Sequence, residues 1–234
     1  MLHDVPGSSR REFLARVLAS SAGVVLWNGT GFGEEGAMAA ARDYPLRDFS
    51  SLRGLRGIPD ALVEAHLKLY AGYVKNLNLL TRGLSQLRLG SPEWTELKRR
   101  QGFEVNGARL HELYFENLTP AKDAPPSALR DAISGAWGTF DAWREEFTAM
   151  GVMRGVGWVI LYRDPVGGTL GNYWITLHEQ GHPAGFTPLL VMDVWEHAFT
   201  GLERPRYVDA FLDNVSWRAV EARSRASAVK AKAA

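Results

Sequence analysis

Asp193-Val194-Trp195-Glu196-His197 is the stretch that says most about how this chain folds and what it does. The spacing of four residues between Asp193 and His197 can aim a carboxylate and an imidazole at one point. That spacing alone is common by chance. The combination with Trp195 and Glu196 makes the motif specific, and it predicts a metal site built from oxygen and nitrogen ligands.

Short apolar runs separated by turn residues predict a small antiparallel sheet around this motif. Residues 157–162 and 169–177 are rich in β-formers, and the Asp-Pro-Val-Gly-Gly run between them indicates a hairpin. Residues 188–192 predict a third strand, which delivers the aspartate of the motif. Residues 127–150 predict an aromatic-rich helix before the first strand, and the chain beyond about residue 205 predicts helix again.

The first half of the chain predicts two long helices, each with one inward histidine. The first helix starts after Ile58-Pro59-Asp60, with Asp60 as its N-cap, and His66 lies on its apolar face. The second carries His111 next to Leu110 on an apolar stripe. A single histidine on such a face is more often a hydrogen-bonded core residue than a ligand. Two on facing stripes both need a buried partner, and a shared cation would satisfy both.

These elements predict an α+β fold, in which an N-terminal α-helical hairpin is followed by an α/β domain with a three-stranded antiparallel sheet. The proline-rich segment 119–126 marks the boundary. We therefore expect a hairpin domain over residues 40–119 and an α/β domain over residues 120–234.

The first 39 residues differ from the rest and predict an export signal. Ser9-Arg10-Arg11-Glu12-Phe13-Leu14 precedes a short apolar stretch, and Ala37-Met38-Ala39 offers a cleavage site. The paired arginines resemble a twin-arginine signal, which predicts a periplasmic or secreted protein. The alternative is an amphipathic N-terminal helix of the fold.

Composition narrows the possible functions further. The chain has 234 residues, a formal net charge of +1 and no cysteine. The absence of cysteine excludes disulfides, zinc–thiolate sites and iron–sulfur clusters, so any metal must be held by histidine and carboxylate. The balanced charge gives no reason to expect nucleic acid as a partner. Because no long apolar run follows the signal, we expect no membrane partner for the mature form.

The chain resembles the iron/manganese superoxide dismutases over roughly residues 43–222. Four stretches and one pair carry the resemblance: Asp193-Val194-Trp195-Glu196-His197-Ala198-Phe199, Arg204-Pro205-Arg206-Tyr207-Val208, Asn214-Val215-Ser216-Trp217, Tyr73-Val74-Lys75-Asn76-Leu77-Asn78 and Gly157-Trp158. The family's architecture, a helical hairpin followed by an α/β domain, agrees with the elements predicted above.

The resemblance implies a mononuclear manganese or iron ion, one per subunit, that converts superoxide to dioxygen and hydrogen peroxide. Its ligands would be His66, His111, Asp193 and His197. Trp158 and Trp195 would keep the pocket dry. Glu196 would reach the ligand histidine of a partner subunit, which predicts a homodimer.

The chain departs from the family at the substrate gateway. The family usually has histidine at the fourth and tyrosine at the eighth position after the first ligand, whereas this chain has Tyr70 at the fourth and Tyr73 at the seventh. Phe199 and Thr200 replace two tyrosines that follow the Glu-His-Ala motif. We expect Tyr70 or Tyr73 to take the gateway role.

Iron-type and manganese-type members of the family carry a characteristic glutamine at different positions, and the position of Gln180 in this chain favours manganese. Iron-type members carry it four residues before the second histidine ligand, where this chain has Gly107. Manganese-type members carry it before the third strand, where Gln180 lies, and His178 or His182 are alternatives. Two other functions remain open, a non-catalytic metal-binding protein with the same ligands and a related redox enzyme with another small substrate.

Overall fold

A computed structural model describes residues 42–233, so the predicted export signal lies outside the described part. Within that part, none of the helices combines the length and the apolar character needed to cross a bilayer. The α+β class predicted from the sequence is confirmed. Helices come first along the chain, and a three-stranded antiparallel sheet follows.

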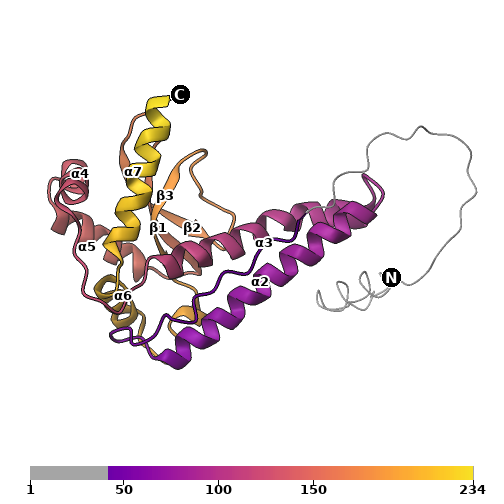
Figure 1. The fold of residues 1–234 in the computed structure, drawn as a ribbon, viewed down its shortest axis with the longest axis horizontal. Coiled ribbons are helices and arrows are strands. Elements are labelled where there is room, and N and C mark those ends of the chain that lie inside the picture. Colours follow the sequence, from indigo (N-terminus) through magenta and orange to yellow (C-terminus); the bar gives the residue numbers. More distant parts are fainter. Residues whose placement is uncertain (1–41, 234) are drawn as a thin grey trace, which may run out of the picture.

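Two long helices form the predicted hairpin, α2 over Asp60–Gln86 and α3 over Pro92–Glu116. They lie side by side and extend well beyond the sheet (Figure 1). Ser91 caps α3 by accepting a hydrogen bond from the Trp94 amide. The prediction for Asp60 is wrong, because Asp60 is the first residue of α2 and its carboxylate accepts from the Gly54 amide of the preceding loop at 2.8 Å.

The segment before α2 runs along the hairpin (Figure 1). Tyr44 is fixed there by both polar groups of the Asn78 side chain, whose oxygen accepts from the Tyr44 amide at 2.7 Å and whose nitrogen donates to the Tyr44 carbonyl at 2.9 Å. This pairing satisfies the backbone of a segment that has no strand partner.

The helix predicted over residues 127–150 is in fact two helices, α4 over Ser127–Trp137 and α5 over Phe140–Gly151. Gly138 adopts a positive φ of 82°, a conformation that glycine reaches without steric cost, and it ends α4. Thr139 then caps α5 by accepting from the Ala142 amide at 3.0 Å. The aromatic periodicity continues across the break, so the sequence pattern predicts one continuous helix.

The sheet consists of β1 (Gly157–Arg163), β2 (Leu170–Thr176) and β3 (Thr187–Asp193), in the order β2-β1-β3. Both pairings are antiparallel, and the central strand β1 is almost wholly buried. The register pairs Trp158 with Asp193. The end of β3 therefore lies against the start of β1, and this places a tryptophan beside the aspartate of the motif.

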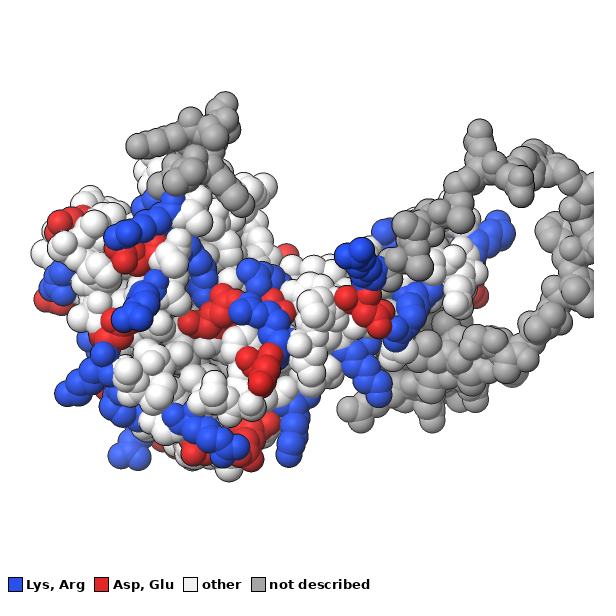
Figure 2. All heavy atoms as spheres, in the orientation of Figure 1, with Lys and Arg blue, Asp and Glu red and all other residues white. Residues whose placement is uncertain are grey.

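The chain ends with α6 over Arg204–Asp213 and α7 over Trp217–Ala233, after a short 3₁₀ turn, η2, over Glu196–Ala198. Helix α7 packs on β3, and α3 covers β3 as well. Figure 2 shows acidic and basic side chains interspersed on one face of the molecule. That face offers no broad surface of one charge for a polyanion.

Candidate metal centre

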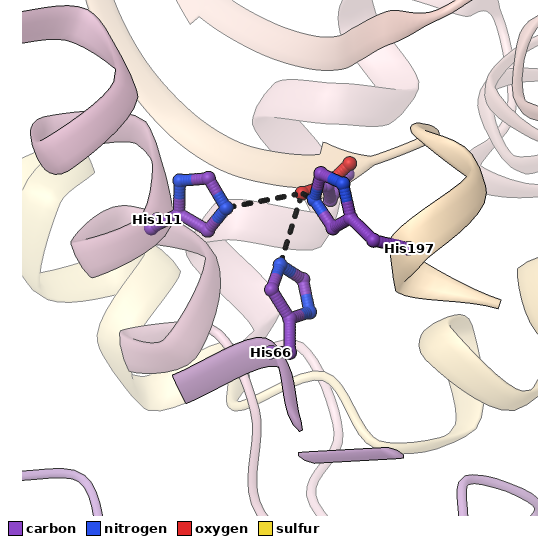
Figure 3. Close-up of side chains that lie close together, drawn as sticks. His66, His111 and His197 are labelled. Carbon is purple, nitrogen blue, oxygen red and sulfur yellow. Dashed lines mark hydrogen bonds and ion pairs between the residues drawn. The ribbon is translucent and has the colours of Figure 1, made fainter. Parts of the chain in front are cut away.

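Three histidines and one aspartate meet at a point where four elements come together. His66 comes from α2, His111 from α3, Asp193 from the end of β3 and His197 from η2. Each offers one donor atom, and these atoms all lie within 4.8 Å of one another. Figure 3 shows the three imidazoles directed at one point. The structure thus brings together all four residues predicted as ligands.

The carboxylate of Asp193 is the centre of this cluster. The distances to its Oδ2 atom are 3.1 Å from His66 Nε2, 3.1 Å from His197 Nε2 and 3.7 Å from His111 Nε2. Asp193 itself is fully buried. The same nitrogen of each ring therefore faces one oxygen, an arrangement that suits a shared cation.

The hydrogen bonding of the His111 ring shows whether the cluster fits a metal ion. Its Nδ1 atom lies 2.5 Å from the carbonyl oxygen of Gly107, which can only accept, so Nδ1 carries the proton. The unprotonated Nε2 atom is buried and has no hydrogen-bond partner. A buried nitrogen without a partner is costly, and a metal ion would satisfy it.

Burial and charge set the protonation of the cluster. Burial lowers the pKa of His66 and holds the pKa of His111 well below its usual value, so both rings are neutral and ready to bind a cation. Burial by itself raises the pKa of Asp193. The charge of His197 and the hydrogen bonds from His197 and His66 outweigh that effect, and the net pKa of Asp193 is lowered. The site therefore holds one negative charge among imidazoles.

The backbone around Asp193 fixes its orientation. Its Oδ1 atom accepts a hydrogen bond from the Trp195 amide at 2.8 Å, and its carbonyl accepts from the Tyr207 hydroxyl at 2.7 Å. Tyr207 comes from α6 and is fully buried. Asp193 is thus held at its carboxylate by Trp195 and at its backbone carbonyl by Tyr207, as a metal-binding residue is when hydrogen bonds outside the ligand set orient it.

Two tryptophans form walls of the cluster. Trp158 is fully buried and meets the His111 ring edge-on, with centroids 5.0 Å apart. Trp195 is half-buried and stacks on His197, with centroids 5.9 Å apart. These aromatic rings exclude water and raise the strength of electrostatic interactions inside the site.

The two candidate gateway tyrosines have different surroundings. Tyr73 lies beside His111, with ring centroids 5.1 Å apart, and its hydroxyl lies 2.8 Å from His178 Nε2. Tyr70 is buried at 1% exposure, and its hydroxyl donates to Glu112 at 3.0 Å and accepts from the Arg47 amide. Tyr73 therefore belongs to the cluster, and Tyr70 ties the N-terminal segment to α3.

The structure does not bring Gln180 to the cluster. Its side chain is exposed, because the turn that follows β2 uses the Gln180 backbone to pair with Thr176. His178 occupies the inner position instead, fully buried, with Nδ1 accepting from Trp158 Nε1 at 3.0 Å. The sequence offered His178 as an alternative to Gln180, and burial distinguishes the two.

Sequence reasoning missed the buried carboxylate next to His111. Glu112 is 1% exposed and accepts hydrogen bonds from the hydroxyls of Tyr70 and Tyr44 and from Arg109. Its partners lie as far as 68 residues away along the chain, so no local pattern pointed to them. Glu196, by contrast, is exposed, as a surface charge or an interface residue would be.

Comparisons with known proteins agree with this geometry. The family model for iron/manganese superoxide dismutases, C-terminal domain, matches residues 125–223. A superoxide dismutase [Fe] of Cupriavidus metallidurans is 36% identical over 182 residues, which are 74% of this chain and 91% of the relative. A superoxide dismutase [Mn] of Mycolicibacterium paratuberculosis is 33% identical over 175 residues, 71% of this chain and 84% of the relative. This chain is therefore a member of the iron/manganese superoxide dismutase family.

Proposed function

We propose that the four-residue cluster is the centre at which this chain converts superoxide into dioxygen and hydrogen peroxide. The observation that carries the proposal is the convergence of four donor atoms, three of them from buried residues, with His111 Nε2 left without a partner. His66, His111, Asp193 and His197 would hold the ion. When bound, manganese or iron supplies one-electron oxidation of one superoxide and one-electron reduction of a second, which takes up two protons.

The protein's own residues set the conditions for this chemistry. Asp193 supplies the negative charge that partly neutralises the cation, and the neutral rings of His66 and His111 bind without adding charge. Trp158 and Trp195 keep bulk water out. Residues that orient the ligands, such as Tyr207, hold the donor atoms in place.

Tyr73 and His178 form a polar pair beside the ligand ring of His111, with ring centroids 5.1 Å and 6.1 Å from it. Trp158 donates to His178 Nδ1, so a neutral His178 carries its proton on Nε2 and donates it to the Tyr73 oxygen. The hydroxyl proton of Tyr73 then points away from His178. We infer that Tyr73 is the gateway residue and offers this proton to the substrate pocket.

Exchanging Tyr73 and Tyr70 separately for phenylalanine tests this assignment. We expect Tyr73→Phe to lower kcat by about 10- to 100-fold at unchanged metal content, the usual effect of losing a hydrogen bond next to a metal site. Tyr70→Phe removes only the bonds to Glu112 and Arg47, so it should lower the melting temperature with kcat nearly unchanged. Steady-state kinetics and metal analysis of both variants decide the matter. Equal kcat in wild type and Tyr73→Phe would contradict the assignment.

We propose manganese as the working ion. Relatives named for iron and relatives named for manganese match the chain about equally well. The support for manganese is that Gly107 stands at the position where iron-type members carry a glutamine. The ring of Tyr73 covers the position that such a side chain would need. Analysis of bound metal in the protein from its native host would test this choice.

We propose that the active form is a homodimer joined through Glu196. Its carboxylate forms no ion pair within residues 42–227, and the neighbouring His197 side chain keeps 27% exposure. A partner subunit could cover both. Glu196→Ala should shift the dimer towards monomer in sedimentation-velocity runs and lower the affinity for metal. A wild-type protein that sediments as a monomer at micromolar concentration would exclude the proposal.

We also propose that residues 1–39 direct export to the periplasm or beyond the cell. The support is the paired arginines followed by an apolar stretch. N-terminal sequencing of the protein from cell fractions provides the test. An exported protein that begins near residue 40 is expected, and an uncleaved cytosolic protein would refute the proposal.

A further inference from the structure

His178 sits in an unusual stretch of backbone. Leu177, just before it, has a φ of 56° and is the one residue other than glycine with positive φ in the described part of the chain. Non-glycine residues rarely adopt this left-handed conformation, and surrounding bonds must offset its energy. The conformation turns the chain after β2 so that the His178 ring enters the core while Glu179 and Gln180 face solvent.

Two side chains bind the carbonyl oxygen of His178. Asn106 Nδ2, on α3, donates to it at 2.7 Å, and His182 Nε2 donates to it at 3.0 Å. His182 is in turn fixed by the hydroxyl of Tyr162 on β1, which lies 2.7 Å from His182 Nδ1. The oxygen is therefore held from a helix and from the sheet at once. Neither bond is needed for regular secondary structure.

The ring of His178 must be placed accurately because its two nitrogens have different hydrogen-bond partners. Trp158 Nε1 donates to Nδ1 at 3.0 Å, and Nε2 lies 2.8 Å from the Tyr73 hydroxyl. A rotation of the backbone at His178 would break one or both contacts. The ring could then take its other tautomer, and Tyr73 would have to turn its proton towards His178.

We propose that Asn106 and His182 are positioning residues for His178, which hold its carbonyl so that the ring bridges Trp158 and Tyr73 in a single tautomer. The expected effect on turnover rests on the proposed function. The expected tautomer of His178 does not, because the chain's own hydrogen bonds determine it.

The test uses the full chain with two substitutions that remove the donors, Asn106→Leu and His182→Phe, and one that keeps a donor, His182→Gln. In manganese-loaded protein we expect the first two to lower kcat by about tenfold each, and His182→Gln to recover most of that loss. In a His178→Ala background the same substitutions should change kcat by less than about twofold, because their effect passes through the missing ring. Losses of the same size in both backgrounds would overturn the inference.

A second readout is independent of activity. ¹⁵N NMR of histidine-labelled, metal-free full chain reports which nitrogen of His178 carries the proton. We expect one tautomer, protonated on Nε2, in wild type and a mixture in Asn106→Leu and His182→Phe. An unchanged single tautomer in both variants would overturn the inference whatever their activity. Manganese-loaded wild type without dismutation would refute the proposed function, and the tautomer would still decide the positioning roles.

Discussion

Replacing His111 by leucine is expected to abolish metal binding and dismutation while leaving the metal-free protein at least as stable as wild type. The buried Nε2 atom has no hydrogen-bond partner without a metal, which costs about 1–3 kcal/mol. Leucine removes that cost. The bond from Nδ1 to the Gly107 carbonyl is lost as well, but the helix backbone of α3 still uses that oxygen.

Chemical denaturation of metal-free wild type and of metal-free His111→Leu tests the stability part of this prediction. We expect the free energy of unfolding to stay the same or rise by up to about 2 kcal/mol in the variant. Adding manganese at 1,000 times its Kd should stabilise wild type by about 4 kcal/mol and His111→Leu not at all. A metal-free variant that loses several kcal/mol would show that His111 is a structural residue of the core.

Replacing Gly107 by alanine is expected to lower kcat by about 100-fold with full metal content, as displacements of about 1 Å near a reacting centre can do. A Cβ atom at Gly107 would lie 2.4 Å from Tyr73 Cδ1 and 2.7 Å from Tyr73 Cε1, closer than real contacts allow. The Tyr73 ring must therefore move, and its bond to His178 is lost. Alanine is otherwise favoured over glycine in a helix by about 1 kcal/mol.

Gly135→Ala provides the matched control for this substitution. Gly135 is also helical, in α4, and a Cβ atom there would meet nothing within 4 Å. We expect this control to raise the melting temperature and keep wild-type kcat. A Gly107→Ala variant with wild-type kcat would mean that the Tyr73–His178 contact has no part in turnover.

Local patterns in the sequence predicted the main elements of the fold. The helical period around His66 and His111 gave the hairpin, and three short apolar runs gave the strands. The break at Gly138 escaped prediction because a single glycine between aromatic residues is compatible with a continuous helix. The carboxylate of Asp60 can serve either its own helix or the loop before it, and only the three-dimensional fold decides between them.

The ligand set was predictable because features that are each weak alone, two histidines on apolar helix faces and the Asp193–His197 pair, are joined into one site by the resemblance. The residues that surround the ligands were not predictable, because their contacts join positions far apart along the chain. Tyr73 meets His178 across 105 residues, and Tyr70 meets Glu112 across 42. The sequence left Tyr70 and Tyr73 equivalent, and it left Gln180 and His178 as alternatives. Burial and hydrogen bonding distinguish them in the structure.

Bound metal and superoxide consumption, measured in the same preparation of the full chain and of its His111→Leu variant, test the central claim most directly. We expect wild type to carry about one manganese ion per subunit, the complement of a single four-donor site, and to dismutate superoxide rapidly. The variant should carry no metal and show no activity. Wild type with a full complement of metal and negligible dismutation would contradict the account, and so would rapid dismutation by the metal-free variant.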